Sequence, residues 1–451
     1  MKRNRSIRST NFLLLPVGPQ VSKNFKEKIL GQMLHDQIFL VLRQDQTILR
    51  YGETEFNRLG HDRRYYRTII DRCRELGRLV LKAKELNPNV TKLSQLLRAS
   101  NYQLLKQSVF KEAEFNNETN LFNKPSYALK VGISVRKCAT MLKGDYLQDE
   151  ILREYIPELE AFLCVMEAKW FTEVSSHAHR TLAEVKWNKR KTVPLTRDIQ
   201  KLNKYLNKQI IIEQDNLEGG PNILAFKNLV EISLVMTIIL NRRRVGEVQY
   251  MLLKDYESAL KCDPNSDIFQ ILTESEKQLS QSLIRLEIKG KIGRGVPVLL
   301  TEKLQSILNL INTRREECGV VKSNPYLFPS LSNVSGHYPT HKIIQKWTKA
   351  SGCVNVSTLT STKLRKHVAV MAQLLNLREH ELDNLAKFMG HDIRVHREYY
   401  RLADETLQLS KINKLLLNLE KAKLGEMKGK NLDEITFEDE GEDENSESEN
   451  D

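Results

Sequence analysis

The sequence of 451 residues contains few of the two residue types that most often interrupt regular structure. Glycine and proline together account for 32 residues, about 7% of the chain, whereas an average protein contains roughly 12%. This shortage excludes a collagen-like chain and disfavours an all-β fold, which needs many turns. It predicts a mainly α-helical protein with a small β-sheet.

Cysteine is also scarce and is never closely paired. No two of the six cysteines form a CxxC arrangement, which argues against both a disulfide framework and a zinc cluster. The six residues are Cys73, Cys138, Cys164, Cys262, Cys318 and Cys353. We therefore expect buried or idle thiols, no metal and no cofactor.

Long apolar runs are absent as well. The longest, from Leu229 to Leu240, spans twelve residues and contains Glu231. A membrane-spanning helix needs about 20 apolar residues, so this run predicts a buried core helix and no membrane partner. The apolar stretch near the start, Phe12 to Leu15, is too short for a signal peptide. We expect the protein to remain inside the cell.

Positive charge, in contrast, is abundant and unevenly distributed. The formal net charge is +13, but residues 432–451 contain eleven acidic residues and no basic one. Without those eleven negative charges, residues 1–431 carry about +24. A strongly basic body most often binds nucleic acid, and less often an anionic membrane or acidic proteins.

The chain divides into four segments by composition. A concentrated run of charge, KWNKRK at residues 186–191, is followed by Thr192 and Pro194 and has the composition of a linker. The predicted segments are a basic disordered start (1–23), a helical region (24–190), a second domain (191–420) and an acidic disordered tail (421–451).

Apolar periodicity predicts helices through most of both central segments. In the first, which we expect to be all-helical, the patterns cover His61–Leu86, Leu93–Val109 and Leu152–Val174. In the second they cover a helix with Thr196 as its N-cap, Phe226–Leu240, Glu302–Thr313, His341–Ala350, Thr362–Leu375, Arg378–Phe388 and Val395–Leu417.

The clearest β signal is a hairpin in the second domain. Ile284, Leu286 and Ile288 alternate with polar residues, and a glycine-rich stretch separates them from Val296 and Val298. This region predicts the small β-sheet of an α+β domain.

Several residues of the second domain could act on a phosphodiester without a metal, because such chemistry needs a nucleophile, fixed cations and an acid. On a helix, Glu247 lies one turn after Arg244 and can hold its guanidinium. Arg242 to Arg244 would by themselves indicate only a solvated helix end. The other candidates are Lys291 in the glycine-rich hairpin, Arg365 in the run LRKH, His391 after Gly390, a natural helix C′ residue, and Tyr400 nine residues later.

Taken in order, these residues resemble the catalytic domain of tyrosine recombinases, the phage integrase family. The phrase YLFPS at residues 326–330 fits the same family. The resemblance covers about residues 190–420, and the helical region before it is similar to the core-binding domain of that family. The run MGHDIRVHREYYRL most resembles eukaryotic mobile-element versions, such as the Crypton group, and implies a nuclear protein.

The resemblance implies a role for each residue. Tyr400 would attack phosphorus to give a 3′-phosphotyrosine, and Tyr399, one residue short of the family spacing, would pack as a helix side chain. The remaining roles are clamping of the phosphate oxygens by Arg244 and Arg365, protonation of the leaving oxygen by Lys291, hydrogen bonding of the phosphate by His391, and support by Glu247. The implied partner is double-stranded DNA, bound by a homo-oligomer, a tetramer in the active form.

One position departs from the family pattern. Where the family has a histidine three residues before the second arginine, this chain has Thr362, which cannot pass a proton near pH 7. His367 could substitute, although a helix directs it away from Arg365. Three readings stay open: an active DNA strand transferase, a domesticated DNA-binding protein that cuts weakly or not at all, and a helical scaffold that binds acidic proteins.

Overall fold

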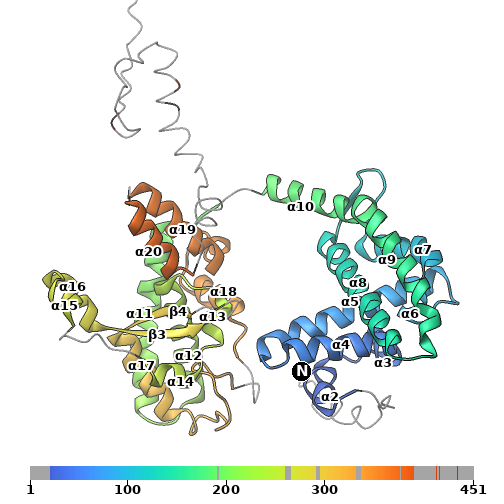
Figure 1. Cartoon of the computed structure of the whole chain (residues 1–451). Helices are drawn as coiled ribbons and strands as arrows, with labels where there is room; N and C mark the ends of the chain where they lie inside the picture. The colour runs from blue at the N-terminus through green and yellow to red at the C-terminus, as the bar shows by residue number, and fades with distance from the viewer. Residues whose placement is uncertain are drawn as a thin grey trace, which may run out of the picture. The chain divides into compact units, whose positions relative to one another are not determined.

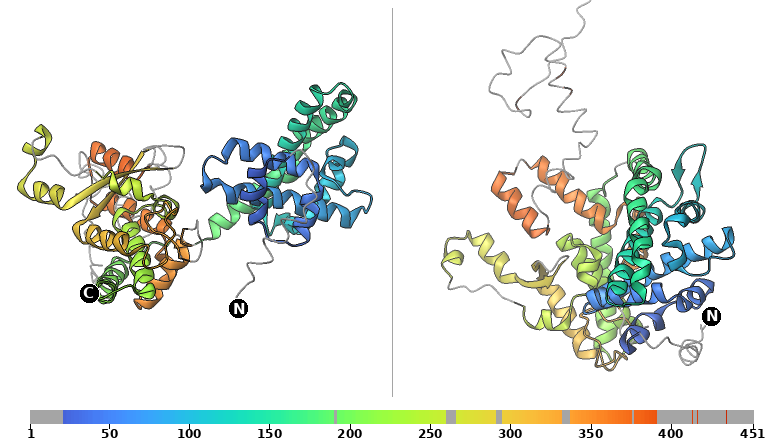
Figure 2. Two further views of the ribbon diagram at one scale, coloured as in Figure 1. Left: turned by 90° about the horizontal axis from the view of Figure 1, so that it is seen from below. Right: turned by 45° about the vertical axis from the view of Figure 1, so that its right-hand side comes forward.

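The chain folds into two compact units, residues 1–190 and 191–451. The computed structural model (Figures 1 and 2) describes residues 21–189, 192–259, 266–290, 295–331, 337–375, 377–390, 413, 416 and 434. The described part is mainly α-helical with two small antiparallel sheets, so the expected fold class is confirmed. The expectations for the first 20 residues, the helix at 395–417 and the acidic tail concern segments outside the described residues.

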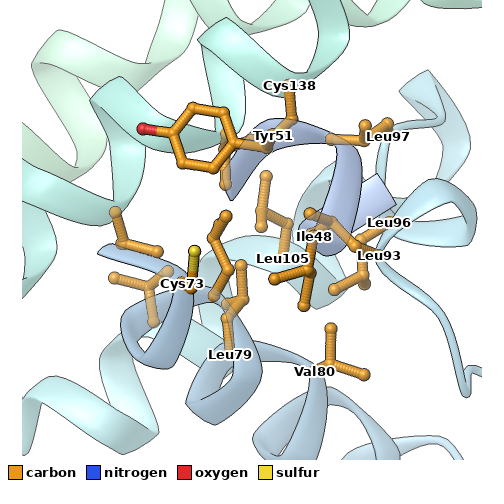
Figure 3. Packing of buried hydrophobic residues seen from close by; sticks show 14 of the residues in the cluster. Ile48, Tyr51, Cys73, Leu79, Val80, Leu93, Leu96, Leu97, Leu105 and Cys138 are labelled. Atoms are coloured by element: carbon orange, nitrogen blue, oxygen red, sulfur yellow. The ribbon is translucent and has the colours of Figure 1, made fainter. Parts of the chain in front are cut away.

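The first unit is a helical assembly around α5 (Tyr66–Leu86), which contacts α3, α4, α7 and α8. Its other helices are α2 (Lys23–Lys28), α3 (Gln37–Gln44), α4 (Gln46–Leu59), α6 (Leu93–Leu96), α7 (Tyr102–Ala113), α8 (Pro125–Leu147), α9 (Ile156–Trp170) and α10 (Ser176–Asn188). Figure 3 shows part of its core, where apolar side chains of several helices interdigitate around Ile48 and Leu79. A continuous core of this size accounts for the stability of the unit without disulfides.

Two sequence expectations for this unit are wrong. The predicted helix at 93–109 is interrupted, because the side-chain amide of Asn101 donates to the carbonyl of Gln95 at 2.7 Å and so takes the acceptor that a continuous helix would need. The unit is also not purely helical: β1 (Phe115–Asn116) pairs with β2 (Leu121–Phe122). A short polar turn joins these two strands, since Asn116 accepts from the amides of Glu118 and Thr119.

Helix α9 continues into α10 through a π-helical segment, Phe171–Ser175. Just before it, Trp170 packs on α8 so closely that a Cβ at Gly132 would lie 2.3 Å from Trp170 Nε1. Only glycine therefore fits at position 132.

The second unit is an α+β assembly with one hairpin. Its elements are α11 (Thr196–Glu218), α12 (Ile223–Asn241), α13 (Val245–Gln249), α14 (Leu253–Glu257), α15 (Asp267–Gln270), α16 (Glu274–Ser282), β3 (Leu283–Lys289), β4 (Gly295–Thr301), α17 (Glu302–Arg314), α18 (Thr340–Ala350), α19 (Ser361–Leu374) and α20 (Glu379–Phe388). In Figure 1, α19 and α20 lie at one end of this unit, α14 and α17 lie at the other, and the hairpin lies between them.

Helix α12 forms the core of the second unit, in contact with α11, α17, α18 and β4. Among the described residues it is the one helix apolar and long enough to cross a membrane, but two thirds of its apolar window (67%) is buried within the protein. Its buried carboxylate, Glu231, accepts hydrogen bonds from Lys346 at 2.6 Å and from Trp347 at 3.2 Å. These contacts confirm the expected core helix.

Strands β3 and β4 form the expected hairpin, in the register that pairs Ile288 with Val296 and Lys289 with Gly295. The start of α11 differs from expectation, because Leu195 occupies its N-cap position and Thr196 is the first helical residue. The hydroxyl of Thr196 lies 3.2 Å from Nε2 of His367 on α19. A tertiary contact has thus taken the hydroxyl that the sequence pattern assigned to a cap.

Candidate functional site

The site is built around a three-residue loop, Arg242 to Arg244, which we call the arginine loop and which connects α12 to α13. Asn241, the last residue of α12, donates to the carbonyl of Leu299 at 2.8 Å and accepts from its amide at 2.7 Å. This two-way pairing fixes the end of α12 on β4. Arg242 then takes a left-handed conformation with φ of 51°, which turns the chain out of the helix.

Arg243 is fully buried, with 0% of its surface exposed. Its Nη2 atom donates to the carbonyl of Pro297 on β4, and its guanidinium lies 4.4 Å from the centre of the Phe388 ring at the end of α20. Burial lowers the pKa of Arg243 to about 10, the charge of Glu247 raises it, and the charges of Arg365 and Arg244 lower it. The residue therefore remains a cation at neutral pH, in a region shared with two more arginines.

Arg244 is more accessible to solvent than Arg243 or Arg365, with 43% of its side chain exposed. Glu247 lies one helical turn later and accepts from both ends of the residue, at 3.0 Å from Nη1 and at 3.1 Å from the main-chain amide. The carboxylate is buried, so it orients the guanidinium from below and leaves the arginine open to solvent. This is the geometry that the RxxE spacing predicts.

Arg365 projects from the first turns of α19 and is buried, with 3% exposed. Its guanidinium donates to two main-chain carbonyls, that of Arg242 at 2.9 Å and that of Met389 at 2.7 Å. Three segments far apart in the sequence are thereby joined: the arginine loop, α19 and the end of α20. Since both acceptors are uncharged carbonyls, these bonds orient the guanidinium without neutralising its charge.

The end of α20 lies beside this cluster. Gly390 has φ of 66° and follows Met389, the C-cap, so it is the C′ residue that the sequence predicts. A Cβ at Gly390 would lie 3.7 Å from Val296 on β4 and 3.9 Å from Arg243. Gly390, the last described residue before position 391, therefore lies near Arg243 and near strand β4 of the hairpin.

The remaining sequence candidates cannot be placed in the same way. Lys291, His391, Tyr399 and Tyr400 lie outside the described residues, so their roles stay predictions. Of the described residues next to these positions, Gly390 lies near Arg243 and near Val296 of β4.

The two doubtful positions on α19 have different environments. Thr362 is exposed in the first turn of the helix. His367 is buried beside Thr196, and burial, followed by the charge of Arg242, lowers the pKa of His367. Because His367 packs against α11 as a neutral ring, we assign it a structural role and not that of a proton acceptor at the arginine cluster.

No metal site is visible in the part of the chain that the structure describes, where no three His, Cys, Asp or Glu side chains cluster. The described arginines, each oriented by a fixed hydrogen-bond acceptor, support the binding and orientation of an anion.

The burial of Arg243 differs from the sequence prediction. A run of three arginines after a buried helix indicates a solvated helix end, and for Arg243 this prediction is wrong. The feature that indicates burial is the mostly buried stretch from Leu229 to Asn241, which directly precedes the arginine loop. Residues that directly follow a buried helix end tend to have little access to water.

No known family model matches the sequence, and no curated protein matches it either. Among solved structures, the chain is similar to the XerH site-specific recombinase bound to difH substrate in a pre-cleavage complex, with 13% identity, a TM-score of 0.40, and coverage of 89% of this chain and 99% of that one. It is also similar to XerH bound to palindromic difH substrate in a post-cleavage complex, with 15% identity, a TM-score of 0.40, and coverage of 88% and 98%.

Proposed function

We propose that this chain is a tyrosine recombinase that binds double-stranded DNA and cuts and rejoins it through a 3′-phosphotyrosine. The observation that carries the proposal is Arg365, buried between the carbonyls of Arg242 and Met389 and thus fixed on the arginine loop that also contains Arg244. Two arginines from α19 and from the arginine loop, oriented by neutral carbonyls and by Glu247, form a site for one phosphate.

In the proposed reaction, the two guanidiniums neutralise the charge that develops on the non-bridging oxygens. Tyr400 attacks phosphorus, its phenolic proton is lost, and the 5′ oxygen leaves with a proton from Lys291, while His391 hydrogen-bonds the phosphate. Because the phosphotyrosine ester preserves the energy of the broken bond, rejoining needs neither ATP nor a metal. A phenol has a pKa near 10, so the cations also serve to favour its ionised form.

A second candidate function is a DNA-binding protein with the same fold that cuts weakly or not at all. Thr362 supports this alternative, since it occupies the position of a proton-transferring residue and His367 is directed elsewhere. We further propose a nuclear protein derived from a Crypton-like mobile element, which forms a tetramer on DNA when active, with residues 24–190 as a second DNA-binding region.

The experiment that tests cleavage uses a DNA duplex with a nick near the cut site, which traps the covalent intermediate. The full-length protein is incubated with this substrate, and covalent protein is measured on a denaturing gel. Tyr400→Phe should eliminate the adduct while DNA affinity and folding stay nearly intact, and Tyr399→Phe is the matched control that should retain it.

The outcomes separate the candidates. An adduct that survives in Tyr400→Phe but not in Tyr399→Phe would move the nucleophile by one residue. Absence of an adduct with salt-dependent DNA binding would favour the DNA-binding alternative. An affinity unchanged between low and moderate salt would contradict DNA binding altogether, since binding many phosphates releases counterions.

A further inference from the structure

We infer that Arg243 is a positioning residue of the proposed phosphate site, one that holds the end of α20 and the β3–β4 hairpin against the arginine loop. The inference rests on the proposed function in one respect: the groups that it would align, at positions 291 and 391, matter for cleavage only if the chain cleaves DNA. The alignment itself is a property of the described residues.

Two contacts place Arg243 at the junction of these elements. Its Nη2 atom donates to the carbonyl of Pro297, and its planar face covers the ring of Phe388 at 4.4 Å. A Cβ on Gly390 would lie 3.9 Å from its Nη1 atom. One side chain thus contacts β4 and the last residue of α20, and it lies close to the glycine two residues later.

These contacts hold the described segments that come before positions 291 and 391 in the sequence. Val296, one residue from Pro297, pairs with Ile288, so fixing β4 also fixes β3. Gly390 precedes position 391 directly. A shift of either element by about 1 Å is enough to reduce catalysis strongly, because reacting groups must lie within hydrogen-bonding reach.

An arginine would also be an unusual residue at position 243 if its side chain only filled space in the core. Arg243 is fully buried, its Nε and Nη1 atoms have no hydrogen-bond partner, and no ion pair with a described carboxylate includes it. A buried charge without a partner is costly, and an apolar side chain of similar volume is often at least as stable in such a place. A guanidinium here does two things that an apolar group cannot: it bonds to the strand and adds positive potential to a site for an anion.

The same unit contains a matched control. Arg315 is also a buried arginine, with 9% exposed, and it too donates to main-chain carbonyls, those of Asn324 at 2.9 Å and Tyr326 at 3.4 Å. Burial lowers the pKa of Arg315 as it does that of Arg243. The two residues therefore differ mainly in what they join, since the carbonyls that Arg315 binds belong to the segment between α17 and α18.

The test compares Arg243→Met, Arg243→Lys and Arg315→Met in the full-length protein. Amide hydrogen exchange is measured without DNA at residues 386–390 and 295–299, and adduct formation and DNA affinity are measured with the nicked duplex. We expect both Arg243 variants to exchange about tenfold faster at these two segments than the parent, and to form adduct about 10- to 100-fold more slowly. DNA affinity should change less than about twofold, because most phosphate contacts lie elsewhere.

Arg315→Met should lose stability without either of the two local effects. Parental exchange at both segments in Arg243→Met, or the same exchange pattern in Arg315→Met, would overturn the inference. Parental behaviour of Arg243→Lys would overturn it too, because a lysine keeps the charge and loses the planar fork. If Arg243→Met does not fold, Phe388→Leu removes the ring that it covers and should accelerate exchange at residues 386–390.

This design separates the two proposals. A parent protein that forms no adduct contradicts the cleavage function, and the exchange data still decide whether Arg243 aligns α20 and the hairpin. A parent that forms adduct, with exchange unaffected by Arg243→Met, contradicts the positioning role alone.

Discussion

The cluster around Glu55 in the first unit and the arginine cluster in the second unit bind their buried charges in different ways. In the first unit the buried carboxylate of Glu55 receives three cations, Arg58 at 2.8 Å, Arg72, and Lys137 at 3.3 Å. In the second unit the buried cations Arg243 and Arg365 donate to main-chain carbonyls.

This difference distinguishes charge used for stability from charge kept for a ligand. A cation paired with a carboxylate is largely neutralised, whereas a cation oriented by neutral carbonyls retains its full charge. The paired cluster around Glu55 therefore stabilises the fold, and the arginine cluster is suited to bind an anion.

The largest expected effect comes from removing the site arginines. Arg365→Ala and Arg244→Ala should each abolish adduct formation on the nicked duplex while DNA binding falls little. Their stability should differ: Arg365→Ala leaves two carbonyls without a donor and should lower the free energy of unfolding by about 2–4 kcal/mol. Arg244→Ala removes a half-exposed ion pair worth less than about 1 kcal/mol. A variant that cleaves as well as the parent would show that its arginine is not part of the site.

The next effect concerns the first unit. Glu55→Gln should destabilise that unit by about 2 kcal/mol, because three cations lose their acceptor but can turn partly toward water. Urea denaturation followed by the loss of helical circular dichroism measures this. Equal loss of DNA affinity and of stability would contradict the assignment of this cluster to folding, and Glu118→Gln, at an exposed turn, is the control.

Lowering the pH should affect the two units in different ranges. Burial, and then the charge of Arg242, holds the pKa of His367 below its ordinary value near 6.5, so the unfolded chain binds this proton more readily and the second unit loses stability as the pH falls through about 6.5. Burial raises the pKa of Glu55, but Arg58, Arg72 and Lys137 outweigh it and hold that pKa below 4.5, so its contribution is lost only below about pH 4.5.

Thermal unfolding between pH 7 and pH 5 measures the difference. His367→Gln should flatten the pH dependence of the second unit in this range, and Glu55→Gln should not. A parent whose melting temperature is constant from pH 7 to pH 5 would contradict the effect assigned to His367.

The smallest effect concerns the acidic tail. If its eleven acidic residues compete with DNA for the basic residues of the protein, removal of residues 432–451 should tighten nonspecific DNA binding several-fold at low salt. At high salt the affinity should hardly change. If the tail only keeps the protein soluble, affinity should not change. Fluorescence anisotropy with a labelled random duplex distinguishes the two.

Much of the fold could be predicted from the sequence because local periodicity and turn residues determine it. The hairpin followed from the alternation of Ile284, Leu286 and Ile288, and the C′ position of Gly390 followed from a glycine after a helical pattern. Local patterns did not predict the side chains whose contacts with distant residues override a helical or capping preference. Asn101, bonded to Gln95, interrupts a helix, and Thr196 bonds to His367, which is 171 residues away.

The candidate site was predictable in part for the same reason. The pairing of Arg244 with Glu247 is a local matter of one helical turn. The burial of Arg243 and the carbonyls around Arg365 depend on how β4, α19 and α20 meet, and no pattern within any one of these segments encodes that.

The π-helical segment Phe171–Ser175 has a consequence for the length of this helix in homologous proteins. A π turn accommodates one residue more than an α turn, and each residue of an α-helix rotates the chain by about 100°. Deleting one residue within this segment would restore a regular helix, but it would also rotate α10 and carry Ala178 and Thr181 out of the interior. A homologue that lacks the π turn should therefore contain one residue fewer within this helix.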